Sequence, residues 1–331
     1  MKKIIFCAGE IGRRAAMLYK TQGIKIDYFV DNSIEMQKKG DVFGIPVISI
    51  DELKEIPDEY SLEIACGDDI YEEIATQLSD AGIFAYERYD RKNFFRKERI
   101  TSYSYKSNCE DIILWHVFKD EEEIFYIDVG CNDPVSASVT KFIYDKGGHG
   151  INIDMVPDMI DFMNIDRKRD VNICAALGEK SGGVVHYYNQ DFLNERTTLV
   201  EKNVFEDLGK SEAKLTTLKD ICDEHIPNGK KISFLKIDVE GYEKQVLLGA
   251  DFKKYRPAVV VIEAVGPING EPTHREWEYI LAESNYEYVY TKGANRWYLA
   301  KEREDLRSKF IPFPELAAHY CIFYAEYGYY V

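Results

Sequence analysis

Four short apolar runs in the second part of this chain each end in a carboxylate side chain, and this recurrence constrains the fold more than any other feature. The acids are Asp128, Asp154, Asp238 and Glu263. Segments of helical character separate the runs, which is typical of parallel strands joined by helices. Because ligands bind outside the carboxyl ends of the strands in open parallel sheets, we expect these acids to lie along one edge and to form a site.

The stretch Phe125–Asp154 indicates half of a nucleotide-binding βαβ unit: a buried strand, a glycine turn, a helix and a second strand. We expect Asp154 to accept hydrogen bonds from both ribose hydroxyls of an adenosine cofactor. Gly130 lets the backbone approach the cofactor, since it has no Cβ. Asp128 and the turn amides can hold a charged amino-acid tail. The turn lacks the G-x-G-x-x-G pattern that seats a pyrophosphate, and Asp133 would repel phosphate, which favours S-adenosylmethionine over NAD.

The rest of the second part continues the alternation of strands and helices. Pro157 is expected to start a helix, since its fixed φ suits the first helical turn. The small residues Ala175 and Ala176 should lie beside the end of the Asp154 strand, where a purine ring can rest against the backbone. The last segment predicts a hairpin around Lys292-Gly293-Ala294. This order predicts a seven-stranded sheet with one antiparallel strand, as in methyltransferases and unlike most dehydrogenases.

Roughly residues 105 to 312 resemble FkbM-type S-adenosylmethionine-dependent methyltransferases. The similarity lies in DVGCNDP, in KIDVEG about a hundred residues later, and in the aromatic tail around NRWYLA. The resemblance implies a class I methyltransferase fold and methyl transfer, commonly to a hydroxyl of a sugar or related metabolite. It places Asp128, Gly130, Asn132 and Asp154 in the cofactor motifs, Asp238, Glu240 and Glu263 in the acidic active-site motifs, and Asn295, Arg296 and Tyr298 in the tail motif.

The chain departs from the family pattern at several positions. Asp154 stands where glutamate is more usual, and Met155 follows it in the cofactor motif. Lys292 replaces an acid of the tail, and Asn108 replaces a glutamine of the entry motif. These departures bear on the substrate more than on the cofactor.

The expected chemistry is in-line attack of a hydroxyl on a sulfonium methyl group, helped by a general base. Asp238, Glu240 and Glu263 are the candidate bases, and His274 is a weaker candidate base and substrate contact. The same three acids could instead bind Mg²⁺, which prefers oxygen ligands and would lower the pKa of the hydroxyl. Sequence spacing does not separate these two alternatives.

Residues 1–92 predict a smaller Rossmann-like parallel-sheet domain. Strand, turn, helix and strand follow one another, with Asp31 closing the second strand, but Cys7 occupies the place of the first glycine of the dinucleotide fingerprint. Gly9 and Asp31 would contact a nucleotide or nucleotide sugar; a structural or docking role is the alternative. Residues 93–122 are expected to form a linker and a helix, with Ser107 as its cap and Glu110 completing a capping box. Residues 123–331 would be the methyltransferase domain.

The composition of the chain narrows the classes of molecule that it can bind. The net charge of -16 and the pI near 5.0 disfavour nucleic acid, and no apolar stretch is long enough for a signal peptide or membrane span. Seven scattered cysteines without a CxxC pair are typical of reduced thiols in a cytoplasmic protein. The apolar C-terminal tail should pack on its own chain, or in a homo-oligomer. Besides the sugar O-methyltransferase, an NAD-dependent sugar-modifying enzyme using the first domain and a non-catalytic scaffold stay open.

Overall fold

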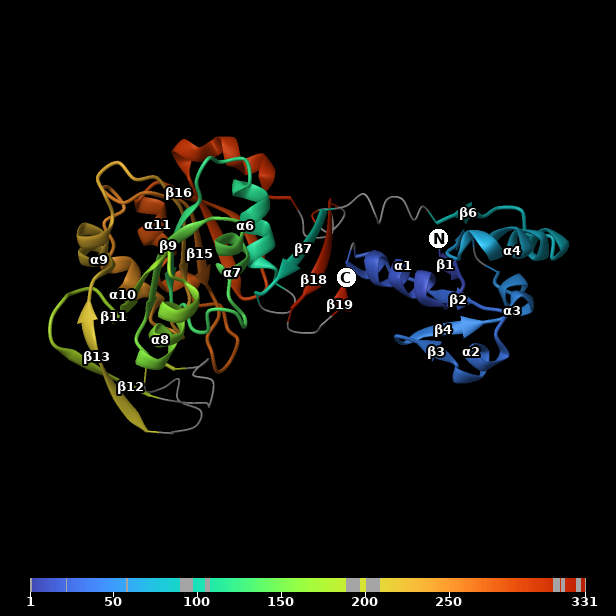
Figure 1. The fold of residues 1–331 in the computed structure, drawn as a ribbon, viewed down its shortest axis with the longest axis horizontal. Coiled ribbons are helices and arrows are strands. Elements are labelled where there is room, and N and C mark those ends of the chain that lie inside the picture. The colour runs from blue at the N-terminus through green and yellow to red at the C-terminus, as the bar shows by residue number, and fades with distance from the viewer. Residues whose placement is uncertain are drawn as a thin grey trace. The chain divides into compact units, whose positions relative to one another are not determined.

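The fold is described from a computed structural model of the chain (Figure 1). It describes residues 2–21, 23–57, 59–89, 98–104, 108–188, 197–200, 209–311, 316, 319–325 and 329–330. These residues form two compact units. The first comprises Met1–Thr101, Ile311–Tyr324 and Gly328–Val331, and the second comprises Ser102–Phe310 and Ala325–Tyr327. Of the predicted domain boundaries, residue 92 lies outside the described residues and residue 122 lies inside the second unit.

The second unit is built on the predicted seven-stranded sheet. The strand order is β10-β9-β8-β14-β15-β17-β16, and only β17 runs antiparallel to its neighbours. The strands are β8 (Phe125–Val129), β9 (His149–Asp154), β10 (Val171–Cys174), β14 (Ile232–Ile237), β15 (Pro257–Glu263), β16 (Tyr286–Lys292) and β17 (Asn295–Ala300). The mixed α/β class, the parallel core and the closing hairpin are therefore confirmed.

Helices cover both faces of this sheet because its central strands are apolar on both sides. Every residue of β8 and β14 is buried. One face packs on α9 (Leu218–His225), α10 (Glu243–Leu248) and α11 (Glu278–Glu283) through a single apolar cluster. On the other face Phe234 stacks on Phe118 of α6 (Glu110–Phe118), and α7 (Lys141–Asp145) packs beside α6.

Helix α8 (Pro157–Asp166) begins with Pro157 at its first turn, as predicted. After β10, Ala176–Leu177 forms the short strand β11, which joins β13 (Lys210–Thr216) and β12 (Val184–Tyr188) in a small separate sheet. Short 3-10 helices at His274–Glu276 and Lys301–Lys309 flank the hairpin segment.

The start of α6 differs from the expected capping box. Cys109, with a left-handed φ of 50°, occupies the N-cap position and makes no side-chain cap hydrogen bond. Glu110 is therefore the first helical residue and not the third, and Ser107 lies outside the described residues. Asp111 instead accepts hydrogen bonds from Ser102, Tyr103 and Ser104, so a buried carboxylate organises the chain before the helix.

The first unit contains a six-stranded sheet of order β3-β4-β2-β1-β5-β6, parallel except at β3. Its strands are β1 (Lys2–Phe6), β2 (Tyr28–Val30), β3 (Asp41–Val42), β4 (Ile45–Ile48), β5 (Tyr60–Ile64) and β6 (Glu87–Arg88). Its helices are α1 (Glu10–Thr21), α2 (Ile34–Lys39), α3 (Ile50–Lys54) and α4 (Asp68–Asp80). The expected Rossmann-like parallel sheet is present.

The dinucleotide fingerprint of the first unit, in which Cys7 replaces the first glycine, keeps the backbone conformation of a glycine turn. Cys7 adopts a φ of 83°, which is the left-handed region that favours glycine. A Cβ on Gly12 would lie 1.7 Å from the carbonyl oxygen of Cys7, so α1 can approach β1 only because residue 12 is glycine. The turn is thus preserved although its first glycine is not.

The C-terminal tail pairs with its own chain, as expected. Strand β18 (Tyr320–Tyr324) lies between β7 (Glu98–Ser102) and β19 (Tyr329–Tyr330) in a three-stranded sheet. Across the residues that the structure describes, every helix is too short or too polar to span a bilayer.

Candidate active site

A cavity opens at the carboxyl edge of the seven-stranded sheet, where the turns after β8, β9, β10 and β14 meet. Its empty volume is about 850 Å³, a figure that includes open solvent at its mouth. Described residues of five segments line it: Val129–Asn132, Ser136, Ala137 and Val139; Ile153–Met155; Ala175–Leu177; Thr197 and Leu199; and Lys236, Asp238–Glu240 and Tyr242. Six of the seven predicted cofactor residues are among them: Gly130, Asn132, Asp154, Met155, Ala175 and Ala176.

Gly130 forms the floor of the turn after β8. Its φ is 71°, and a Cβ there would lie 1.8 Å from the carbonyl oxygen of Asp238. No side chain fits at such a distance, so glycine is required by both the backbone conformation and the approach of the neighbouring strand end. Asn132, two residues on, is also left-handed with a φ of 46°.

Asp154 is held in place by two backbone amides. Its Oδ2 accepts a hydrogen bond from the amide of Asn132 at 3.0 Å, and its Oδ1 accepts one from the amide of Val156 at 2.9 Å. Burial raises the pKa of this carboxyl above its usual range. The carboxylate is therefore fixed beside the turn of β8, where sequence reasoning expects the ribose hydroxyls.

Asp128 occupies a different environment from the other strand-end acids. Its exposure is 1 %, and it is missing from the described residues that line the cavity. Oδ2 accepts a hydrogen bond from Thr140 at 3.1 Å, and Oδ1 forms an ion pair with Lys236 at 3.2 Å. Its carboxylate is engaged inside the protein, and its expected contact with a cofactor tail stays a prediction.

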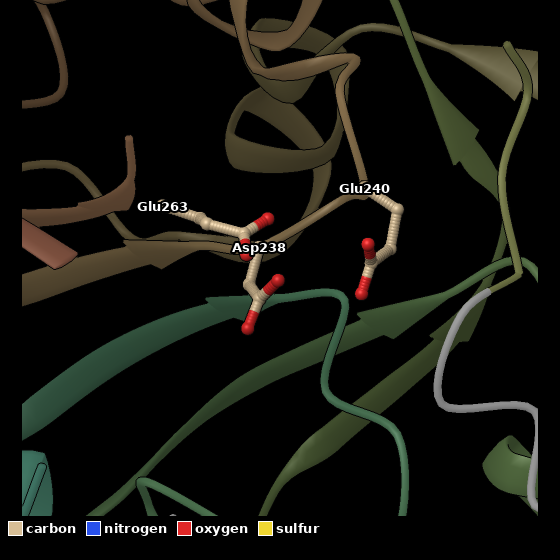
Figure 2. Close-up of side chains that lie close together, drawn as sticks. All are labelled: Asp238, Glu240 and Glu263. Carbon is tan, nitrogen blue, oxygen red and sulfur yellow. The ribbon is translucent and has the colours of Figure 1, made fainter. Parts of the chain in front are cut away.

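The three predicted active-site acids come together at the ends of β14 and β15. One oxygen from each of Asp238, Glu240 and Glu263 lies within 4.8 Å of the others, and Figure 2 shows the side chains converging. Asp238 and Glu240 also line the cavity, whereas Glu263 is not among the described residues that line it. Burial raises the pKa of Glu263 well above its usual range, and the charges of Asp238 and Glu240 add to the effect.

Hydrogen bonds to the side chains of Glu243 and Thr198 hold the turn that carries Glu240. Glu240 has a left-handed φ of 52°, which is uncommon for a residue with a side chain. The buried carboxyl of Glu243 accepts hydrogen bonds from the amides of Gly241 at 3.0 Å and Val239 at 3.4 Å, and Thr198 donates to the carbonyl oxygen of Glu240. Burial raises the pKa of Glu243 to about 7.

None of the four predicted substrate residues belongs to the described lining of the cavity. Tyr298 is 1 % exposed, and its hydroxyl and Arg296 both contact Glu278. Asn295 lies opposite Glu263 in the β15–β17 register and donates to Glu110. For His274, burial and the charge of Arg296 lower the pKa. Arg296 and Tyr298 thus form a network of their own, and only Asn295 is tied by strand register to the acids.

Lys236 is the main site residue that sequence reasoning missed. Its ammonium lines the cavity and lies 2.6 Å from the carbonyl oxygen of Gly130. The available signal was its position two residues before Asp238, since alternate residues of a strand share one face. Tyr242, Ser136 and Thr197 also line the cavity, and nothing in their sequence context distinguishes them.

The cavity residues fit S-adenosylmethionine. Gly130 has no side chain to cover the backbone of its turn, Asp154 offers a fixed carboxylate acceptor, and the small apolar residues Ala175 and Ala176 line the cavity. A seven-stranded sheet of this order, with the acid Asp154 at the end of β9, defines a class I methyltransferase-type fold and site.

Residues 128–288 match the profile of the Methyltransferase FkbM domain. This part of the chain is an FkbM-type methyltransferase domain, as the sequence motifs indicated, and the protein is an S-adenosylmethionine-dependent methyltransferase. No curated protein matches the sequence.

Proposed function

We propose that this methyltransferase acts on a hydroxyl group of a sugar, a nucleotide sugar or a glycan intermediate. The observation that carries the proposal is the convergence of Asp238, Glu240 and Glu263 within 4.8 Å, with Asp238 and Glu240 lining a cavity suited to the cofactor. Carboxylates accept hydrogen bonds from neighbouring hydroxyls and take up the proton that a hydroxyl loses on methylation.

The surroundings of the three acids determine which of them can act as the general base. The bound cofactor supplies an electrophilic methyl group on a sulfonium centre. Glu263 holds a proton more readily than an ordinary glutamate, because burial and its charged neighbours raise its pKa. The base is therefore Asp238 or Glu240, both of which line the cavity. A positioned base of this kind contributes about 10²–10⁴-fold to a rate.

The test compares Asp238→Asn and Glu240→Gln with the wild-type enzyme in a methyl-transfer screen against nucleotide sugars and glycans. Mass spectrometry detects the gain of one CH₂ group. Turnover should fall by about 100-fold or more in the variant that lacks the base, while calorimetry finds S-adenosylmethionine affinity close to wild type. Glu224→Gln, an exposed acid elsewhere, is the matched control. Near-normal turnover in both variants would show that neither Asp238 nor Glu240 is the general base.

A divalent cation such as Mg²⁺ is the second candidate for this cluster. The observation that favours it is Oε2 of Glu263, which is buried and has no hydrogen-bond partner among the described residues. Three carboxylate oxygens suit a hard cation, which would lower the pKa of a bound hydroxyl. Dialysis against a chelator should then abolish turnover, with recovery on added Mg²⁺. Full activity after chelation would exclude the cation, and general-base catalysis would then be the role of the acids.

We also propose a nucleotide or nucleotide-sugar site in the first unit, with Gly9 and Asp31 as contacts. The support is that Asp31 accepts hydrogen bonds from the amides of Ala8 and Ser33, the same pattern that Asp154 makes with Asn132 and Val156. Titration calorimetry with nucleotide sugars and with NAD tests the site, and it separates a sugar carrier from the NAD-dependent alternative. Binding of neither ligand would leave a structural role.

A cytoplasmic setting completes the proposal. The six cysteines whose side chains the structure describes form no disulfide, which is typical of a reducing compartment. Association into a homo-oligomer is compatible with the proposal and is tested by light scattering.

A further inference from the structure

Lys236 occupies an unusual position for a lysine. It lies inside the fully buried strand β14, and its exposure is 7 %. In the parallel pairing of β14 with β8 its register partner is Asp128. The ammonium Nζ lies 2.6 Å from the carbonyl oxygen of Gly130, 3.2 Å from Oδ1 of Asp128 and 3.8 Å from Oδ2 of Asp238.

We propose that Lys236 is a positioning residue for methyl transfer, which holds the cofactor turn at Gly130 and the acid Asp238 in one fixed arrangement. The part that concerns Asp238 rests on the proposed function of the acidic cluster. The part that concerns Gly130 rests only on the cavity geometry.

The contacts of Lys236 join two parts of the site that the backbone brings very close. The carbonyl oxygen of Asp238 lies where a Cβ of residue 130 would be, so the two strand ends touch there. An ammonium has three donors in a compact head, and here three oxygen atoms from two strand ends surround it. One cation thus spans the end of β8 and the end of β14.

Charge explains why a cation is needed between these ends. Asp128 and Asp238 both point their carboxylates at Lys236, and Asp128 is almost fully buried. Removing Lys236 would leave a buried carboxylate uncompensated, which is strongly destabilising. Asp238 would lose the cation that draws it toward the Gly130 turn, and the carbonyl of Gly130 would lose its donor.

A purely structural role is the competing explanation, in which Lys236 only neutralises Asp128. The two explanations differ in a double variant. Lys236→Met combined with Asp128→Asn removes the cation and the buried carboxylate together, and the asparagine side chain keeps the size of the aspartate. A structural role predicts that the double variant recovers its stability and that its cofactor affinity and turnover equal those of Asp128→Asn, the single variant that lacks the same carboxylate. A positioning role predicts that only stability recovers.

The experiment measures melting temperature, S-adenosylmethionine affinity by calorimetry and single-turnover rate at saturating cofactor for Lys236→Met, Asp128→Asn and the double variant. Lys254→Met, an exposed lysine paired with Asp223, is the control. The double variant should melt near wild type but bind S-adenosylmethionine about 10- to 150-fold more weakly than Asp128→Asn, the range expected for lost hydrogen bonds to a charged group. Its turnover should also be slower at saturation.

Equal cofactor affinity in the double variant and in Asp128→Asn would overturn the proposal. Weakened affinity with an unchanged rate at saturation would overturn the part that concerns Asp238. If Lys236→Met alone does not fold, the double variant still decides. Failure of the sugar-methylation proposal has a different signature, since the wild-type enzyme would then methylate no hydroxyl acceptor while the cofactor titrations still give their answer.

Discussion

Gly130 is the residue at which the two sides of the cavity meet, and its replacement is a strong test of the site. Gly130→Ala adds a left-handed strain of about 1–2 kcal/mol and a contact with the carbonyl oxygen of Asp238 that the backbone must move to relieve. We expect a loss of stability above about 3 kcal/mol and no measurable binding of S-adenosylmethionine. Denaturant titration and calorimetry measure these two quantities.

The matched control for this substitution is Gly229→Ala. Gly229 has a φ of 78°, close to that of Gly130, but a Cβ there would have no atom within 4 Å. It should lose only the conformational cost of about 1–2 kcal/mol and bind the cofactor normally. If both variants lose the same stability, the close approach of Asp238 is not what requires glycine.

Single residues divide sharply into those that the sequence could reveal and those that it could not. Gly130, Asp154, Asp238 and Glu240 stand at turns after apolar runs, and the structure brings all of them to one cavity. The surroundings of Asp128 depend on strand register, because its partner Lys236 lies on another strand. A pattern along one chain carries no register between strands, so the ion pair could not be predicted.

At the scale of elements, the closing hairpin is joined to α6 by one buried contact. Asn295, the first residue of β17, donates to Oε1 of Glu110, the first residue of α6, at 2.7 Å. Glu110 is fully buried, and burial raises its pKa to about 7, with the neighbouring Asp111 adding to the effect. Burial of the Glu110 carboxyl makes the stability of the folded protein depend on pH.

The sign follows from proton binding. An unfolded glutamate releases its proton near its ordinary pKa of about 4.3, whereas Glu110 keeps its proton up to about 7 in the folded protein. Between these values the folded state binds more protons, so the free energy of unfolding falls as pH rises. Glu110→Gln keeps the acceptor for Asn295 without the proton. We expect it to be about 1–3 kcal/mol more stable than wild type at pH about 8, with little difference at pH about 4.5.

Denaturant titrations of the two proteins across this pH range measure the difference directly. Glu302→Gln is the control. Arg256 lowers the pKa of Glu302, so the contribution of Glu302 is lost only below the ordinary glutamate pKa of about 4.3, and its difference from wild type should stay constant across this range. A constant difference between Glu110→Gln and wild type across the range would contradict the assigned pKa.

The elements of the second unit were largely predictable because each strand–helix pair is local in sequence. The closing hairpin and a seven-stranded sheet with one antiparallel strand follow from that alternation. The small sheet could not be predicted, since it pairs Ala176 with Leu215 and Leu177 with Thr216 across a long separation. The predicted start of α6 was wrong for a local reason. Cys109 takes the left-handed conformation at the N-cap, so the helix begins later than a Ser107 cap requires.

At the scale of the whole molecule, every described residue that lines the cavity lies between Val129 and Tyr242, inside the second unit. A fragment of residues 102–310 should therefore fold and bind S-adenosylmethionine with a free energy within about 0.5 kcal/mol of the full chain, as expected for distant changes. Circular dichroism checks the fold and calorimetry checks the affinity. A folded fragment that binds no cofactor would show that the first unit contributes to the site.

The single reversed strand has a consequence for how such an enzyme could diversify. Because β17 runs antiparallel to β15, the Gly293-Ala294 turn returns to the edge that carries Glu263, and Ala264 donates its amide to the carbonyl of Ala294. Insertions in this turn would build a rim over the acids from outside the βα repeats that hold the adenosine end. Acceptor range could therefore drift between homologues while cofactor affinity stays constant.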